Sequence, residues 1–343
     1  MYRYIVRRLI QAIPTIFGIT LLSFLIMSAA PGGPTALLAF SPQTTPEQRE
    51  RIAARLGAND PWLLQYVHWL IGDDWRQRDI DGDGEPDMWG QREGILRGDF
   101  GTSFFRSNRD VIDLIGEYIL PTIELTASAL LVGLVFGIPI GIIAAINRGG
   151  TFDNVTRVLA VVFNAVPNFW LGLILILVFG SWLGWLPLAQ RCKPVLIGGC
   201  PPIYERLEYL LLPTFTLGTV YIAGYSRYMR TSMLDVIGQD YIRTAHAKGL
   251  SSRMVWFRHG ARNALIPIAT FLGPALTTLW GGAVLTETIF SWPGIGRQSL
   301  QAVVQQDYPF VMAVVLLGGI ATILGYILSD ILYALIDPRI RFS

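Results

Sequence analysis

Five acidic side chains at alternate positions could bind a hard cation. They are Asp79, Asp81, Asp83, Glu85 and Asp87. Carboxylates at this spacing around a glycine turn match the first nine positions of a calcium loop, in which oxygen ligands surround the ion. The twelfth position is Gly90 instead of a bidentate acid, and Asp-Gly runs also form hairpin tips. The segment 79–90 is therefore interpreted either as a loop for a structural calcium ion or as an acidic surface loop.

The two cysteines of the chain, Cys192 and Cys200, lie in a loop rich in proline and glycine. On the oxidising side of a membrane such a pair is expected to form a disulfide, which stabilises so short a loop by about 2–3 kcal/mol. Free thiols are the alternative. A metal site is not expected, because two cysteines without a nearby histidine supply too few ligands.

The sequence does not carry the motifs of a nucleotide hydrolase. A P-loop ends in Gly-Lys-Ser/Thr, whereas the only lysines, Lys193 and Lys248, follow a cysteine and an alanine. The three histidines have no zinc-type spacing, and no Gly-x-Ser-x-Gly motif is present. We therefore expect no enzymatic activity, no catalytic residue and no resident cofactor other than the possible calcium ion.

The composition places these residues in a membrane protein. Of 343 residues, 52% are hydrophobic and 15% are charged, and the mean hydropathy is +0.45, which is too apolar for an ordinary soluble domain. An apolar run of about 20 residues can cross a bilayer as a helix. The sequence predicts an all-α membrane protein with six transmembrane helices, at residues 9–30, 122–146, 158–183, 209–229, 264–285 and 310–335.

The arginines and lysines indicate how these helices are oriented. Fourteen of the 27 lie at or beside the helix ends on one side, against four on the other, namely Arg191, Lys193, Arg206 and Arg297. Positive residues favour the cytoplasmic side, so both termini are predicted there, in a multi-pass protein of the cytoplasmic (inner) membrane. Residues 1–30 form the N-terminal end and first span, and 336–343 the cytoplasmic tail. Residues 31–120 form a small extracytoplasmic subdomain, in which 62–71 is predicted as a helix or an interfacial belt.

The five-helix core, residues 121–335, contains a basic segment at 230–263 that is predicted to face the cytoplasm. Small residues alternate at Ala245, Ala247 and Gly249, so a helix ending here can lie close to another protein, and the glycine can adopt the left-handed conformation that stops it. A second short helix is expected after Ser251 or Ser252. The alternative is a basic loop held near anionic headgroups.

The run from Arg243 to Leu250, followed by Arg262-Asn-Ala-Leu-Ile-Pro267, resembles the cytoplasmic EAA loop of ATP-binding-cassette (ABC) importer permeases. Specifically, it resembles the B-type permease of dipeptide, oligopeptide and nickel importers, with Thr244 in place of the opening glutamate. The resemblance implies a type I ABC importer permease fold. It also implies an ATPase contact at Asp240, Arg243, Ala245, Ala247, Lys248, Gly249 and Leu250.

A second part of the resemblance is the run from Glu287 to Arg297, which is similar to the signature loop of the same family. In that family the loop is external and lies near the translocation path. The resemblance therefore makes Glu287 and Trp292 candidates for pathway contacts. Asn164, in a predicted span that also contains Pro167, is a third candidate, although polar residues and prolines also serve helix packing alone.

The resemblance also implies partners and a function. The partners are a second homologous permease, two ATPase subunits that use ATP, and an extracytoplasmic substrate-binding protein, with no role for nucleic acid. The expected function is to provide the pathway for dipeptides or oligopeptides. A permease for nickel or another small solute is the alternative within the family, and an ion-coupled secondary carrier is the alternative from another class. The carrier would require coupling charges inside the membrane.

Overall fold

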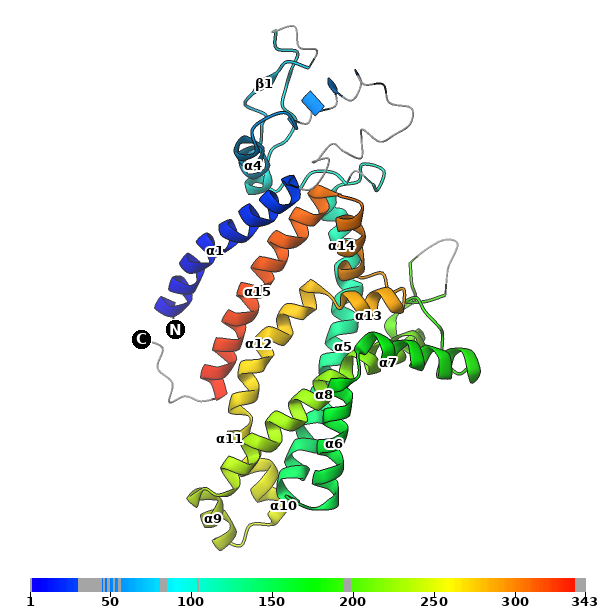
Figure 1. The fold of residues 1–343 in the computed structure, drawn as a ribbon. Helices are drawn as coiled ribbons and strands as arrows, with labels where there is room; N and C mark the ends of the chain where they lie inside the picture. The colour runs from blue at the N-terminus through cyan, green and yellow to red at the C-terminus, as the bar shows by residue number, and fades with distance from the viewer. Residues whose placement is uncertain are drawn as a thin grey trace. The chain divides into compact units, whose positions relative to one another are not determined.

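The computed structural model is mostly helical and describes residues 2–29, 45, 47, 50–51, 53–54, 57–80, 85–103, 105–193 and 199–336 (Figure 1). The chain forms two compact units. Unit 1 comprises Met1–Arg8, Tyr118–Arg297 and Ala321–Ser343, and unit 2 comprises Leu9–Glu117 and Gln298–Ile320.

Long apolar helices dominate the chain. They are α1 (Tyr2–Ser28), α5 (Val111–Ile146), α8 (Leu207–Ile237), α12 (Ile266–Gly281) and α15 (Tyr308–Ile336). Within the described residues, five stretches are long and apolar enough to cross a membrane, and a bent pair of helices makes a sixth if it is counted as one span. The six predicted apolar runs overlap these stretches, and several helices extend beyond the predicted bounds.

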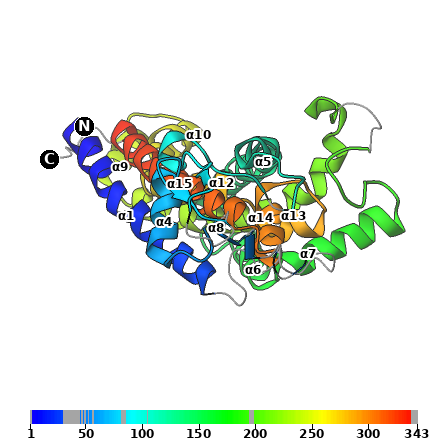
Figure 2. The same ribbon diagram turned by 90° about the horizontal axis from the view of Figure 1, so that it is seen from above.

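The third predicted span, 158–183, is not one continuous helix. The structure divides it into α6 (Thr151–Ala165), α7 (Asn168–Leu175) and a π-helix, η3 (Ile176–Trp182), with a bend of 98° after α6. Figures 1 and 2 show α7 lying across the direction of α6. Val166 is extended, at φ −75° and ψ 122°, because it precedes Pro167 and a proline disfavours helical backbone in the residue before it.

In unit 1, α5 and α8 pack closely along a glycine stripe. A Cβ atom at Gly133, Gly137 or Gly141 would lie 2.3, 2.9 or 2.6 Å from the Cβ atom of a residue on α8. Those residues are Tyr221, Tyr225 and Met229. Since real side chains do not approach so closely, only glycine allows this contact, as in other packed membrane helices.

Shorter helices of unit 1 lie at the two ends of α8 (Figure 1). Beyond its C-terminal end come α9 (Asp240–Ala247), α10 (Ser252–Met254), the π-helix η5 (Val255–Gly260) and α11 (Ala261–Ala264). The 3-10 helix η4 (Ile203–Glu205) precedes α8. The N-terminal half of α8 contacts α7 and α13 (Val284–Ile289). Helix α14 spans Ile295–Val304 and has residues in both units.

Unit 2 contains a small subdomain between α1 and α5. Its described elements are α4 (Trp62–Ile71), β1 (Gln77–Arg78), β2 (Met88–Trp89) and the 3-10 helix η2 (Ile95–Arg97). Of the two predictions for residues 62–71, the helix is confirmed. Tyr66 of α4 is buried against α1, where its hydroxyl lies 2.9 Å from Thr20 Oγ1. The strands are antiparallel, with Gln77 opposite Trp89.

Candidate functional site

The basic segment forms two connected helical pieces at the C-terminal end of α8. We call residues 240–264 the coupling segment. Its first piece, α9, ends at Ala247, and Gly249 has φ +76°, which is the left-handed conformation predicted from the sequence. The second piece is less regular than predicted, because a π-helix lies between α10 and α11. Ser251 stands at its N-cap but makes no side-chain capping hydrogen bond with the described residues.

Two apolar residues of α9 fix the coupling segment to the core of unit 1. Ile242 is 1% exposed, and Ala245 is also buried. Both belong to a cluster with Met229 and Met233 of α8. Gly260 completes this contact, since a Cβ atom there would lie 2.6 Å from Met233 Cε. The two helices α9 and α8 therefore share one close-packed cluster.

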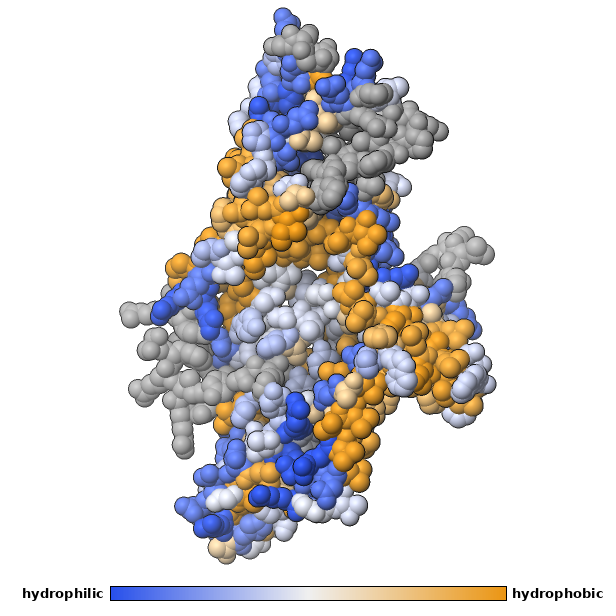
Figure 3. Space-filling view, in the orientation of Figure 1, coloured by the Kyte–Doolittle hydropathy of each residue, from blue (hydrophilic) through white to orange (hydrophobic). Residues whose placement is uncertain are grey.

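The opposite face of α9 is open. The side chains of Asp240 and Arg243 are 97% and 77% exposed and are 3.7 Å apart, a separation at which an exposed ion pair adds little stability. Residues 247–249 are exposed as well. Figure 3 shows hydrophilic residues gathered at this end of unit 1. The structure therefore leaves a polar surface at the tip of the coupling segment.

Not every residue of the predicted ATPase contact lies on that surface. Ala245 is buried within the chain, so its assignment to a partner contact is corrected: it packs in the core one helical turn after Ile242. Leu250 is half-buried against the same cluster. Sequence reasoning missed Ile242, although an apolar residue three positions before Ala245 is the ordinary signal of a buried helical face.

An ion pair not foreseen from the sequence joins α6 to α8. Arg230 donates two hydrogen bonds to the fully buried Asp153, at 2.5 and 2.8 Å. The backbone N–H of Gly149 donates a third, at 2.9 Å. The sequence contains one indication of this site. Asp153 falls in the first turn of a helix that follows a Gly-Gly pair, and carboxylates are favoured near helix N-termini. Two-pronged arginine contacts of this kind fix geometry.

A second charged cluster lies at the other end of α8. Glu124 of α5 accepts hydrogen bonds from Arg191 Nε at 3.0 Å and from Arg206 Nη2 at 2.9 Å. Both arginines come from the loop that also contains the cysteines. In the structure Cys192 and Cys200 are joined as a disulfide. The loop is thus attached to α5 at two arginines, and one of them adjoins the bridge.

The loop after α13 is organised around Glu287. Its carboxylate accepts hydrogen bonds from Thr122 Oγ1 at 2.9 Å and from the backbone N–H of Arg297 at 2.8 Å. A Cβ atom at Gly294 would lie 2.4 Å from this carboxylate, so the loop needs glycine there. Trp292 Nε1 donates to the carbonyl of Pro121 at 2.8 Å.

These contacts show where the structure places Glu287 and Trp292, whose role as pathway contacts stays a prediction. Both side chains are 0% exposed in the single chain, and both hold the loop against α5. Asn164 is exposed on α6, where its amide donates to the carbonyl of Ala160 at 2.8 Å. Its role as a pathway residue stays a prediction.

The calcium interpretation falls partly outside the described residues, which omit Asp81 and Asp83. The flanking strands β1 and β2 pair as a hairpin, and Asp87 accepts a hydrogen bond from the backbone N–H of Ile80 at 2.7 Å. Among the described residues, no group of three or more His, Cys, Asp or Glu side chains could hold a metal ion. Calcium binding through Asp79, Glu85 and Asp87 with the two remaining aspartates stays a prediction.

The broken pair α6 and α7 carries a large apolar surface, seen in Figure 3 as hydrophobic residues over both helices. Exposed large apolar side chains on it include Val158, Val161, Phe169, Trp170 and Leu173. An apolar surface of this extent requires lipid or a partner protein to cover it.

Comparison with known proteins identifies the family. Residues 137–342 match the model of the binding-protein-dependent transport system inner membrane component, and residues 1–126 match the corresponding N-terminal model. The chain is 38% identical to the oligopeptide transport system permease protein AppB of Bacillus subtilis (strain 168), with 100% of each chain covered. It is 35% identical to the dipeptide transport system permease protein DppB of Escherichia coli (strain K12), with 99% of each covered. It is also 35% identical to the glutathione transport system permease protein GsiC of the same strain, with 100% of each covered.

The fold also resembles a solved structure. Inward-facing conformations of the MetNI methionine ABC transporter superpose with a TM-score of 0.51 at 17% identity, covering 66% of this chain and 97% of the other. This likeness concerns the fold alone. Together with the family match, it confirms the predicted all-α, type I permease fold. The chain belongs to the inner membrane components of binding-protein-dependent transport systems, that is, to the permeases of ABC importers.

Proposed function

We propose that this permease provides, with a homologous partner, the pathway by which short peptides enter the cytoplasm. The names of the relatives support a peptide substrate, since full-length matches are permeases for oligopeptides and dipeptides. A further full-length relative serves glutathione, itself a small peptide, which favours a small peptide-like substrate over a metal ion. Both termini and the coupling segment are assigned to the cytoplasm, as the distribution of arginine and lysine favours.

The energy is supplied by separate ATPase subunits. Each ATPase contacts the exposed tip of a coupling segment. The contact is made through Asp240, Arg243, Ala247, Lys248 and Gly249. The observation that supports this contact is that α9 has two different faces. One face is polar and exposed, and the other is packed in the core at Ile242. A partner pulling on the open face would move α8 through that core.

The remaining partners follow from the same assignment. A second permease would cover part of the apolar surface of α6 and α7, with lipid covering the rest. A substrate-binding protein would deliver peptide on the extracytoplasmic side. Asn164 lies beside the bend between α6 and α7 and is proposed as a contact on the pathway, since breaks in a span permit irregular backbone beside a cavity.

The test is ATP-driven uptake of labelled dipeptide, oligopeptide and glutathione by vesicles that contain the whole importer. Gly249 and Gly238 offer a matched pair, because an added Cβ atom meets open space at both, whereas only Gly249 has a positive φ. Gly249→Leu should abolish uptake and ATPase association without reducing membrane insertion, because a leucine there strains the turn by about 1–2 kcal/mol and reshapes the tip. Gly238→Leu should retain both. Normal uptake and normal association in Gly249→Leu would contradict the proposal.

A further inference from the structure

Helix α4 of unit 2 carries an apolar stripe on its surface. Leu63, Val67 and Ile71 recur at every fourth position, so they lie on one face of the helix. They are 56%, 38% and 42% exposed, and Trp62 at the start of the helix is 40% exposed. No aspartate, glutamate, lysine or arginine occurs in Trp62–Ile71. An exposed stripe without charged neighbours on its own helix favours an apolar partner. We call these three residues the α4 stripe.

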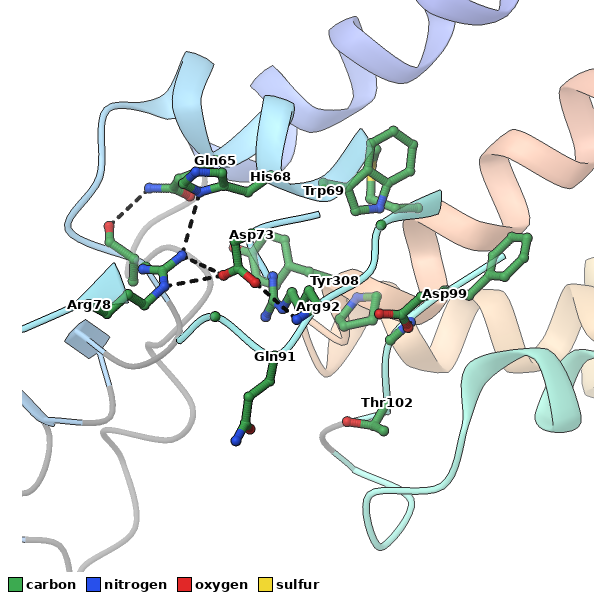
Figure 4. A pocket seen from close by; sticks show the side chains of 18 of the residues that line it. Gln65, His68, Trp69, Asp73, Arg78, Gln91, Arg92, Asp99, Thr102 and Tyr308 are labelled. Carbon is green, nitrogen blue, oxygen red and sulfur yellow. Dashed lines mark hydrogen bonds and ion pairs between the residues drawn. The ribbon is translucent and has the colours of Figure 1, made fainter. Parts of the chain in front are cut away.

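The polar residues of α4 face the interior of the subdomain. Gln65 and His68 lie on a different side of the helix from the α4 stripe and line a cavity with Asp73 and Arg78 (Figure 4). Nδ1 of His68 lies 3.5 Å from Nη2 of Arg78. The same Nη2 donates a hydrogen bond to Asp73 at 2.7 Å. These contacts turn the polar side of α4 inward, so the apolar stripe is left at the surface.

Tyr66 fixes α4 against α1 within the same unit. Its hydroxyl oxygen lies 2.9 Å from Thr20 Oγ1, and the two residues are 3% and 2% exposed. The centroid of its ring lies 5.7 Å from that of Phe17 and 5.5 Å from that of Phe24. A buried hydrogen bond inside an aromatic cluster therefore sets the place of α4 along α1.

The position of this contact along α1 determines the depth of α4. The apolar stretch Ile5–Ser28 has 24 residues and is about 36 Å long, against roughly 30 Å for the hydrocarbon core of a bilayer. Thr20 lies about 12 Å before the end of this stretch at Ser28. Around it, Leu22 and Ile26 are 61% and 73% exposed, as expected for side chains that face hydrocarbon. Helix α4 is therefore joined to α1 at the level of the lipid, before the end of the span.

One backbone carbonyl at each end of α4 accepts a hydrogen bond from a side chain of the protein. The carbonyl of Ile71 accepts from Arg97 Nη2 at 2.9 Å. Just before the helix, the carbonyl of Asp60 accepts from Gln65 Nε2 at 2.7 Å. Backbone groups near lipid need such internal partners, because water is not there to replace them. These contacts suit a helix at the membrane boundary.

We propose that α4 lies in the extracytoplasmic interface of the bilayer, with the α4 stripe against the acyl chains and Trp62 among the headgroups. Interfacial helices combine an apolar face, a polar face and aromatic residues at the boundary. The stripe continues the lipid-facing surface of α1, to which Tyr66 joins it. The choice of leaflet rests on the orientation given under the proposed function, whereas the contact with lipid rests on the joint with α1 alone.

The test is the accessibility of a nitroxide label at Val67→Cys in the purified full-length chain, placed in lipid nanodiscs. The two native cysteines are joined in a disulfide, so each variant has one free thiol. Electron paramagnetic resonance measures how often the label collides with oxygen, which concentrates in hydrocarbon, and with a nickel chelate, which stays in water. The assay needs neither ATP nor transport, so its outcome is independent of the proposed function.

Two control variants in the same unit define the extremes. Leu22→Cys places the label on an exposed position of the α1 span, and Arg109→Cys places it on an exposed charged position before α5 begins. The ratio of oxygen to nickel collisions for Val67→Cys should approach that of Leu22→Cys and exceed that of Arg109→Cys severalfold. Leu63→Cys, one turn earlier on the stripe, should give the same result and decides if Val67→Cys does not fold.

Two results would overturn the proposal. The first is a collision ratio on the α4 stripe equal to that of Arg109→Cys, which would place the stripe in water. The second is a stripe that the nickel chelate reaches in the single chain but not after a second permease or a substrate-binding protein is added. In that case the stripe would be a contact with a protein and not with lipid.

Discussion

Thr122 Oγ1 on α5 donates a 2.9 Å hydrogen bond to Glu287 Oε1 on α13, 165 residues later in the chain. The same hydroxyl oxygen accepts a hydrogen bond from the backbone N–H of Ile295 at 2.7 Å. One threonine therefore joins α5 to both ends of the loop between α13 and α14. The side chains of Thr122 and Glu287 are both fully buried, so neither can exchange its partner for water.

This relationship predicts a coupled loss of stability. Thr122→Val keeps the shape but removes the hydroxyl, and Glu287→Gln keeps the shape but turns an amide donor toward backbone N–H groups. Each should lower the free energy of unfolding by about 1.5–3 kcal/mol, the range for hydrogen bonds to charged groups. The double variant should lose less than the sum, as measured by thermal inactivation in a double-mutant cycle. Strict additivity would mean that the two side chains act independently.

The glycine stripe predicts opposite effects of one substitution at two positions of α5. Gly133→Ala places a Cβ atom 2.3 Å from Tyr221 Cβ and should destabilise the protein by about 1–3 kcal/mol through overpacking. Gly116→Ala meets open space on the same helix and should be neutral or stabilise by up to about 1 kcal/mol, because alanine favours helix. Thermal stability in nanodiscs distinguishes them. Equal effects at the two positions would argue against close packing of α5 on α8.

Reduction of the disulfide should loosen the loop that bears Arg191 and Arg206. Removing the Cys192–Cys200 bridge is expected to cost about 2–3 kcal/mol in chain entropy for so short a loop. Cys192→Ser, Cys200→Ser and the double variant should be equally destabilised, and a thiol reductant should affect only the unsubstituted protein. A reductant effect that persists in the double variant would show that the bridge is not the element responding.

Much of the architecture follows from the sequence because its physical causes are local. A run of about 20 apolar residues needs no partner to be recognised, and Gly249 stops α9 through its own backbone freedom. The buried contacts could not be foreseen in this way. Asp153 meets Arg230, and Thr122 meets Glu287, across 77 and 165 residues, and no periodicity pairs such distant positions. Ala245 was predicted wrongly for a different reason. A small residue suits both a close contact with a partner and a tightly packed core, and the structure places Ala245 in the core.

Acidification should destabilise the subdomain that contains α4. Burial, and next the charge of Arg78, lower the pKa of His68 in the folded state below its ordinary value of 6.5, against the opposing effects of Asp60 and Asp73. The unfolded chain therefore binds a proton more readily, so this contribution to stability is complete above about pH 6.5 and is lost as the pH falls below it. The fall in unfolding temperature between about pH 7 and pH 5 should be smaller in His68→Gln than in the unsubstituted protein. An identical fall in both would exclude His68 as the cause.

The central claim, that a nucleotide-driven partner acts on the exposed tip of the coupling segment, is tested most directly by cross-linking. Both native cysteines are joined in a disulfide, so Lys248→Cys introduces one free thiol on the open surface beyond α9, and Arg109→Cys introduces one in unit 2 as a control. In the assembled importer, Lys248→Cys should cross-link to the ATPase with a yield that changes on ATP binding, and Arg109→Cys should not. Labelling of Lys248→Cys by a membrane-impermeant thiol reagent from outside intact cells, or the absence of any cross-link to the ATPase, would contradict the account.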